Sequence, residues 1–189
     1  RSIGYDIPSA SFAPTSPVIS ATADEIAAAL LVVLPGWTHH DLVQRINTLA
    51  EGAPMAEAVP LVPFLTALRA RGLRLGVATN DTEAPARAHL EAHRITGLFD
   101  FVAGYDSGHG PKPGPGMCLA FARSQGLDPS RVVMVGDSLH DLVAGRAAGM
   151  RTVAVLTGVA RHADLVAHAD IVLADIGGLP DWLDALSEA

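Results

Sequence analysis

The sequence predicts an α/β fold built on a Rossmann-like parallel sheet, and three observations support this. The hydrophobic fraction of 49% comes mostly from Ala, Leu and Val, with only 5% aromatic residues, which favours helices packed on buried strands over an antiparallel sandwich. From residue 73 onward, short apolar runs alternate with amphipathic stretches, as in strands joined by crossover helices. The length of 189 residues suits one core with a small accessory unit.

The N-terminal part of the chain predicts a small helical unit without a strand. Thr22 and Glu25 form a capping-box pattern at the start of an apolar helix that stops at a Pro-Gly pair. Thr38 can cap a second helix, after which a segment containing Gly and Pro breaks the helical pattern and indicates a linker. We therefore predict a helical unit at 1–52 and an α/β core at 53–189.

The core predicts alternating strands and helices, each placed by its apolar spacing and by the Gly and Pro residues that bound it. The predicted strands are 73–79, 101–105, 131–136, 151–156 and 170–173, and the predicted helices are 60–71, 83–93, 114–125, 139–148, 161–167 and 179–186. Because the two kinds of element alternate, we expect the strands to run parallel.

Composition also narrows the classes of partner. The formal net charge is -7 with acids and bases scattered, so the sequence carries no basic stripe for nucleic acid and no polybasic patch for a membrane. The single cysteine, Cys118, cannot form an internal disulfide, which favours a reducing, cytoplasmic location. We expect a small-molecule partner and a protein that is a monomer or a homodimer.

Polar residues gather where predicted strands end, which is where open α/β sheets bind their ligands. Thr79 closes the strand 73–79, and the helix that follows begins with N–H groups that suit a phosphate. Alternatively, Thr79 simply caps that helix. Lys112 lies in a loop that its flanking prolines and glycines keep non-helical and stiff. Taken alone, Lys112 could equally be an ordinary exposed lysine.

Two carboxylates follow the strand 131–136. Asp137 and Asp141 stand four residues apart where a buried strand meets a helix, so both can face the same side of a site. A helix N-cap would explain Asp137 but not a second acid one turn later. Mg²⁺ prefers few carboxylates together with waters or phosphate oxygens, so the pair predicts a magnesium site.

The order Thr79, Lys112, Asp137 and Asp141 resembles the haloacid dehalogenase-like superfamily. The segments Val-Ala-Thr-Asn, Lys-Pro-Gly-Pro and Gly-Asp-Ser-x-x-Asp look most like those of phosphoglycolate phosphatase-type members. The resemblance covers the chain from about Val59 to its end. It implies a parallel α/β core with a helical cap, of which 1–52 would be a remnant.

The resemblance also implies an activity and assigns roles to residues. It implies a Mg²⁺-dependent phosphatase that hydrolyses a small phosphorylated metabolite, with phosphoglycolate preferred, through an aspartyl-phosphate intermediate. Thr79 and Lys112 would be the catalytic residues that bind the phosphoryl group, and Asn80 is a further phosphate-binding candidate. Asp137 and Asp141 would hold the metal.

The nucleophile motif of the family is missing from the sequence. Members begin with an apolar strand ending in Asp-x-Asp-Gly-Thr, whereas Asp6 follows a short apolar run without the second acid or the glycine. In the family this strand lies in mid-sheet, between the strands that here end at Thr79 and at Asp137. We therefore expect an N-terminal segment outside these residues to carry it, and we expect its two neighbouring strands not to pair with each other. Each buried backbone group left unpaired costs about 1–3 kcal/mol, so the sheet should be unstable without that strand.

Other functions stay open from the sequence. Hydrolytic dehalogenases share the fold and the aspartyl nucleophile but need no Mg²⁺, so the acid pair argues against them. A chain without a nucleophile also fits a pseudoenzyme, a truncated fragment or a phosphate-binding module. A receiver-type signalling domain is disfavoured, because its acid pair precedes the Thr and Lys.

Overall fold

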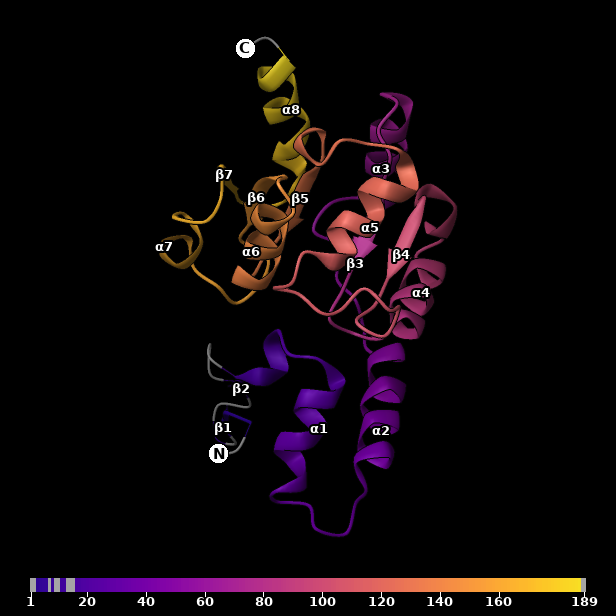
Figure 1. The fold of residues 1–189 in the computed structure, drawn as a ribbon, viewed down its shortest axis with the longest axis vertical. Coiled ribbons are helices and arrows are strands. Elements are labelled where there is room, and N and C mark those ends of the chain that lie inside the picture. Colours follow the sequence, from indigo (N-terminus) through magenta and orange to yellow (C-terminus); the bar gives the residue numbers. More distant parts are fainter. Residues whose placement is uncertain (1–2, 7, 9–10, 13–15, 188–189) are drawn as a thin grey trace.

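The computed structural model describes residues 3–6, 8, 11–12 and 16–187. The N-terminal residues form a helical lobe at one end of the molecule, and the rest of the chain forms a layered α/β body (Figure 1). Parallel strands lie in the middle of this body with helices on both sides. The predicted fold class is confirmed.

Two helices form most of the N-terminal lobe. Helix α1 (Ala23–Leu31) begins at the predicted capping box, in which the Thr22 hydroxyl accepts from the Glu25 N–H and the Glu25 carboxylate accepts from the Thr22 N–H. Helix α2 (His39–Glu51) begins at Thr38, whose hydroxyl caps its first turn. Both predicted helix starts are confirmed. They could be predicted because each cap depends only on local hydrogen bonds.

The prediction that no strand occurs in the first 50 residues is wrong. Strand β1 (Tyr5–Asp6) pairs antiparallel with strand β2 (Ser11–Phe12), and the Tyr5 and Phe12 ring centroids lie 4.9 Å apart. Strands of two residues are too short to produce an alternating pattern, so hydrophobic periodicity does not reveal them.

The parallel sheet is divided into two parts. Strand β3 (Gly76–Ala78) pairs with β4 (Phe101–Ala103), while β5 (Val133–Gly136), β6 (Arg151–Val155) and β7 (Ile171–Leu173) pair in that order. Within the described residues no ladder joins β3 to β5, as expected from the absence of the strand that separates them in the family. The five predicted core strands are confirmed, each somewhat shorter than its apolar run.

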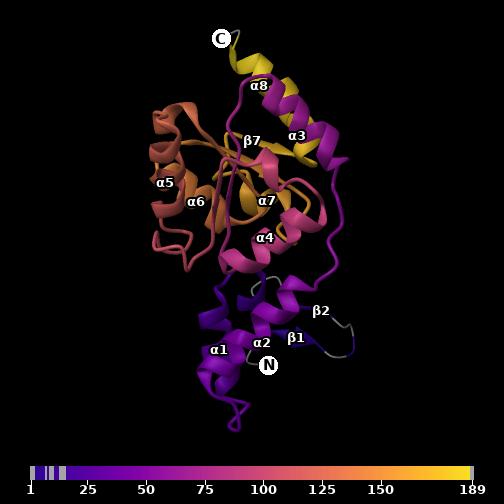
Figure 2. The same ribbon diagram turned by 90° about the vertical axis from the view of Figure 1, so that its right-hand side faces the viewer.

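Helices cover both faces of the divided sheet. Helices α5 and α6 lie on one face, and α3 and α4 lie on the other (Figure 2). The bounds are α3 (Leu61–Ala70), α4 (Glu83–Ala92), α5 (Gly116–Gln125), α6 (Leu139–Ala147), α7 (His162–Leu165) and α8 (Leu179–Ser187), with 3₁₀ turns at Pro17–Ile19, Thr96–Leu98, Pro129–Arg131 and Ile176–Gly178. Among the described residues, no helix is long and apolar enough to cross a membrane.

The hydrophobic core is divided like the sheet. One buried cluster packs α3 and α4 on the β3–β4 pair, and two others pack helices on β5, β6 and β7. The first consists of Leu65, Leu68, Leu90 and Ile95; the others consist of Cys118, Ala122, Val132, Ala144, Ala148 and Met150, and of Leu142, Ala154 and Leu165. Each half-sheet therefore has its own core on its side of the gap.

Candidate active site

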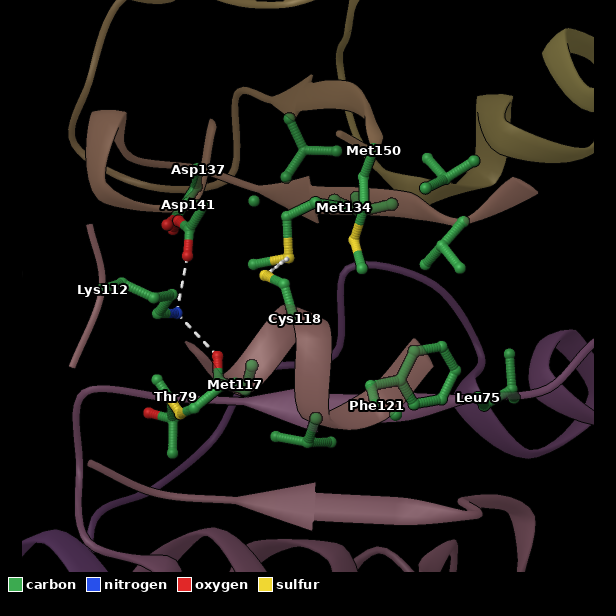
Figure 3. A pocket seen from close by; sticks show the side chains of 18 of the residues that line it. Leu75, Thr79, Lys112, Met117, Cys118, Phe121, Met134, Asp137, Asp141 and Met150 are labelled. Carbon is green, nitrogen blue, oxygen red and sulfur yellow. Dashed lines mark hydrogen bonds and ion pairs between the residues drawn. The ribbon is translucent and has the colours of Figure 1, made fainter. Parts of the chain in front are cut away.

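The predicted site residues meet at one end of the gap between the half-sheets. Thr79 directly follows β3, Asp137 directly follows β5, and Lys112 lies in the loop between β4 and α5. With Asp141 of α6, they line a cavity of about 850 Å³ that extends between β3 and β5 (Figure 3). The carboxyl ends of strands from both half-sheets thus supply one site, as the sequence predicted.

Lys112 connects the two half-sheets. Its Nζ donates to the C=O of Ala78 at the end of β3 and to Oδ1 of Asp141, each at 2.6 Å. The Lys112 and Asp141 side chains are only 10% and 8% exposed, so the reading of Lys112 as an ordinary exposed lysine is wrong. An ammonium group has three N–H donors, and the third can meet an anion in the cavity. Lys112 is also the only lysine in the sequence.

Both carboxylate oxygens of Asp141 are engaged. Oδ1 accepts from Lys112, and Oδ2 accepts from the N–H and the hydroxyl of Ser138, at 3.1 and 2.7 Å. Ser138, not Asp137, is the N-cap of α6. Asp141 is therefore the reciprocal acid of this cap, so helix capping does account for a second acid near Asp137, contrary to the sequence reasoning. Its role as a metal ligand stays a prediction.

Gly136 makes room for this arrangement. A Cβ at Gly136 would lie 2.4 Å from Oδ2 of Asp141, a distance that real Cβ atoms do not adopt. Glycine at the end of β5 therefore lets the carboxylate pack directly against the strand. This close approach holds Asp141 beside Lys112.

The carboxylate of Asp137 lies beside Asp141 (Figure 3) and close to Gly158. Desolvation, and to a smaller extent repulsion by the Asp141 carboxylate, raise the pKa of Asp137 above its ordinary value of 3.8, although Lys112 acts in the opposite direction. A carboxylate whose charge is disfavoured in this way gains from a nearby cation.

The residues present fit a sparse magnesium site. In the described part of the chain, no group of three or more His, Cys, Asp or Glu side chains could hold a metal ion. Mg²⁺ differs from most protein-bound metals in that one or two carboxylates suffice when waters and phosphate oxygens complete its shell. Asp137, with Asp141 next to it, matches that requirement.

Thr79 does not cap a helix. Helix α4 has Thr82 at its N-cap position, and its first N–H, that of Glu83, donates to Oδ1 of Asp106 at 2.9 Å. The expectation that the start of this helix offers free N–H groups is therefore wrong for Glu83. The Thr79 hydroxyl lies at the strand end, accepts from the Asp81 N–H at 3.0 Å, and belongs to a residue that lines the cavity.

Asn80 has a structural task that sequence reasoning missed. Its Nδ2 donates to the C=O of Lys112 and of Ser20, at 2.9 and 2.8 Å, and its Oδ1 accepts from the Lys112 N–H at 2.8 Å. Nδ1 of His140 lies 3.1 Å from the same Ser20 oxygen. Asn80 thus fixes the Lys112 loop and ties the N-terminal lobe to the site; its role in phosphate binding stays a prediction.

The Asn80→Ala variant should therefore lose stability. It removes the partners that Asn80 gives to the part-buried N–H and C=O of Lys112 and one partner of the Ser20 C=O, and we expect a loss of about 1–3 kcal/mol in the free energy of unfolding. Urea denaturation measures this loss. Asn47→Ala on α2 is the matched control, with an expected change below about 0.5 kcal/mol. Equal effects of the two variants would contradict the role given to Asn80.

Comparison with known protein families identifies the family of this chain. The family model for haloacid dehalogenase-like hydrolases matches residues 15–155. The chain belongs to this family. The matched range starts well before the expected start at Val59 and takes in helices α1 and α2 of this haloacid dehalogenase-like chain.

Curated relatives and solved structures agree with this family. The chain is 40% identical over 120 residues to a phosphoglycolate phosphatase of Rhodospirillum rubrum, covering 64% of this chain and 50% of the relative. A phosphoglycolate phosphatase of Aquifex aeolicus is 32% identical over 117 residues, covering 61% and 55%. A predicted phosphoglycolate phosphatase from Haemophilus somnus 129pt shares the fold, with a TM-score of 0.75 at 22% identity over 87% of this chain and 79% of that one. The chain spans about half the length of the curated relatives it matches.

Proposed function

We propose that this chain is the phosphate- and metal-binding part of a Mg²⁺-dependent phosphatase that acts on a small phosphorylated metabolite. Phosphoglycolate is the preferred substrate, because relatives named for it align with this chain. The observation that carries the proposal is the meeting of Thr79, Lys112 and Asp137 at one end of a single cavity. A phosphoryl group needs a hydroxyl donor, a fixed cation and a metal-binding carboxylate around its oxygens.

Each residue has a distinct task in this proposal. The Thr79 hydroxyl donates to a phosphoryl oxygen, and the third N–H of Lys112 donates to another. Asp141 keeps Lys112 in position through its 2.6 Å contact. Mg²⁺, held by Asp137 with Asp141 beside it, would offset negative charge on the phosphoryl oxygens.

The nucleophile in this proposal is an aspartate from a segment outside residues 1–189. Its carboxylate oxygen attacks phosphorus, the bond from phosphorus to the ester oxygen breaks, and the leaving oxygen takes up a proton to become an alcohol. Water then attacks the aspartyl phosphate, which releases inorganic phosphate and restores the carboxylate. Residues 1–189 without that aspartate should therefore not turn over esters.

Phosphate release tests the proposal. Protein expressed from the complete gene should release inorganic phosphate from phosphoglycolate, or from another ester in a panel of small phosphate esters, only when Mg²⁺ is present. Halide release from 2-haloacids without Mg²⁺ would instead support the dehalogenase alternative. Phosphate binding without hydrolysis of any ester would support the non-catalytic alternative.

A further inference from the structure

A second cavity, of about 600 Å³, adjoins the cavity that holds the predicted site residues. Asp137, Ser138 and His140 line both cavities, so the two meet where β5 leads into α6. Ile19 and Ser20 of the N-terminal lobe also line both. A ligand whose phosphoryl group lies beside Asp137 can therefore extend into the second cavity.

The segment between β6 and α7 forms one wall of the second cavity. Its residues Gly158, Val159 and Ala160 line this cavity. A Cβ at Gly158 would overlap the carboxylate of Asp137, so a residue without a side chain is needed for the segment to pack directly against that carboxylate. This close approach places Val159 immediately beside the contact with the site.

Apolar side chains stand uncovered in the second cavity. Val159 and Leu139 both line it, and they are 55% and 41% exposed. Ile19 adds a third apolar side chain from the lobe. Such side chains favour a ligand group that removes them from water. Among the described residues that line this cavity, none is a lysine or an arginine, so its chemistry suits an uncharged, apolar group.

We propose that the second cavity binds the organic group of the phosphate ester and that Val159 is a specificity-determining residue. This assignment rests on the proposed function, because it is the phosphoryl group beside Asp137 that directs the rest of the ester. A cavity of about 600 Å³ accommodates a larger organic group than the two carbons of phosphoglycolate. Monoesters of apolar alcohols are therefore additional substrates, and the side chain that selects them belongs to the α/β body.

Two phosphonates test the proposal with the protein expressed from the complete gene. Methylphosphonate and n-butylphosphonate carry the same anionic group on a carbon–phosphorus bond that resists hydrolysis. Isothermal titration calorimetry with Mg²⁺ present measures the affinity of each. n-Butylphosphonate should bind more than about tenfold more tightly, because its three additional methylene groups cover the apolar wall.

A matched pair of variants locates the preference. Val159→Ser should reduce the ratio of the two affinities by about threefold or more, since it removes apolar surface from the wall. Val166→Ser is the control, because Val166 is 47% exposed and lines neither cavity. It should leave the ratio unchanged. Both positions are exposed, so neither substitution should prevent folding.

The outcomes separate this proposal from the proposed function. Equal binding of the two phosphonates, or equal ratios for Val159→Ser and Val166→Ser, would overturn the assignment of Val159. Absence of binding by both phosphonates would overturn the second cavity and the phosphate site together. Should the preference for n-butylphosphonate depend on Val159 while no phosphate ester is hydrolysed, the subsite stands and the phosphatase activity fails.

Discussion

Replacing Lys112 by Met should remove about 3–5 kcal/mol from the free energy of unfolding, because it leaves the buried Asp141 carboxylate without its cation. The Nζ of Lys112 also satisfies the C=O of Ala78, which would lose its partner. Such a loss is a large part of a typical stability of about 5–15 kcal/mol. Urea denaturation of the protein expressed from the complete gene, at neutral pH and followed by far-ultraviolet circular dichroism, measures it. The variant should also bind inorganic phosphate more weakly.

The chain offers a matched control for this variant. Arg87 pairs with Glu83 at 2.6 Å, the same distance as in the Lys112–Asp141 pair, but on the exposed surface of α4. Arg87→Met should change the free energy of unfolding by less than about 1 kcal/mol. The double variant Lys112→Met/Asp141→Asn should lose less than the sum of its single variants, because the two groups interact directly. Equal losses for Lys112→Met and Arg87→Met would show that the buried pair contributes no more to the free energy of unfolding than the exposed pair does.

Replacing Asp137 by Asn should weaken Mg²⁺ binding by more than the roughly 10–100-fold caused by losing an outer-shell partner of a metal site. Isothermal titration calorimetry with MgCl₂ measures the affinity. Mg²⁺ should also raise the thermal stability of the unmodified chain and leave that of Asp137→Asn nearly unchanged, since a ligand stabilises only the state that binds it. Asp181→Asn on α8 is the control and should keep full affinity. Equal Mg²⁺ binding by Asp137→Asn and the unmodified chain would exclude Asp137 as a ligand.

In the absence of Mg²⁺, the Asp137→Asn substitution should increase the stability of the protein. Folding raises the pKa of Asp137 above 3.8, so its contribution to stability is fully present below pH 3.8 and is lost as the pH rises through the raised value. At neutral pH the Asn variant lacks this unfavourable charge and should be somewhat more stable than the unmodified chain without Mg²⁺. The difference should diminish below pH 3.8. Urea denaturation across this pH range, with EDTA present, measures it.

Most of the fold could be predicted from the sequence because its signals are local. Apolar runs bounded by Gly and Pro located β3 to β7, and the capping patterns at Thr22 and Thr38 located the starts of α1 and α2. The β1–β2 pair was missed because two-residue strands leave no periodic pattern. The unpaired edges of β3 and β5 were expected only through the family resemblance, since nothing local in the sequence marks a missing neighbour.

The site was predicted less completely, because some of its contacts join distant parts of the chain. Thr79, Lys112 and Asp137 were found from their positions at strand ends, and they do line one cavity. The sequence indicates Asn80 as a phosphate-binding candidate, which stays a prediction, but it does not reveal the hydrogen bonds of Asn80 to Ser20 and Lys112, because these residues are 60 and 32 positions away. The pairing of Asp141 with Lys112 was missed for the same reason.

The presence of one lysine among residues 1–189, with its amine held between β3 and α6, provides a spectroscopic reporter of this site. Reductive methylation with ¹³C-formaldehyde would label a single lysine amine within residues 1–189, so the NMR signal of Lys112 is readily identified. The low exposure of Lys112 means that the rate of labelling itself measures how often the two half-sheets separate. Addition of phosphate or Mg²⁺ should slow that rate, because both would bind beside Lys112 in the same cavity.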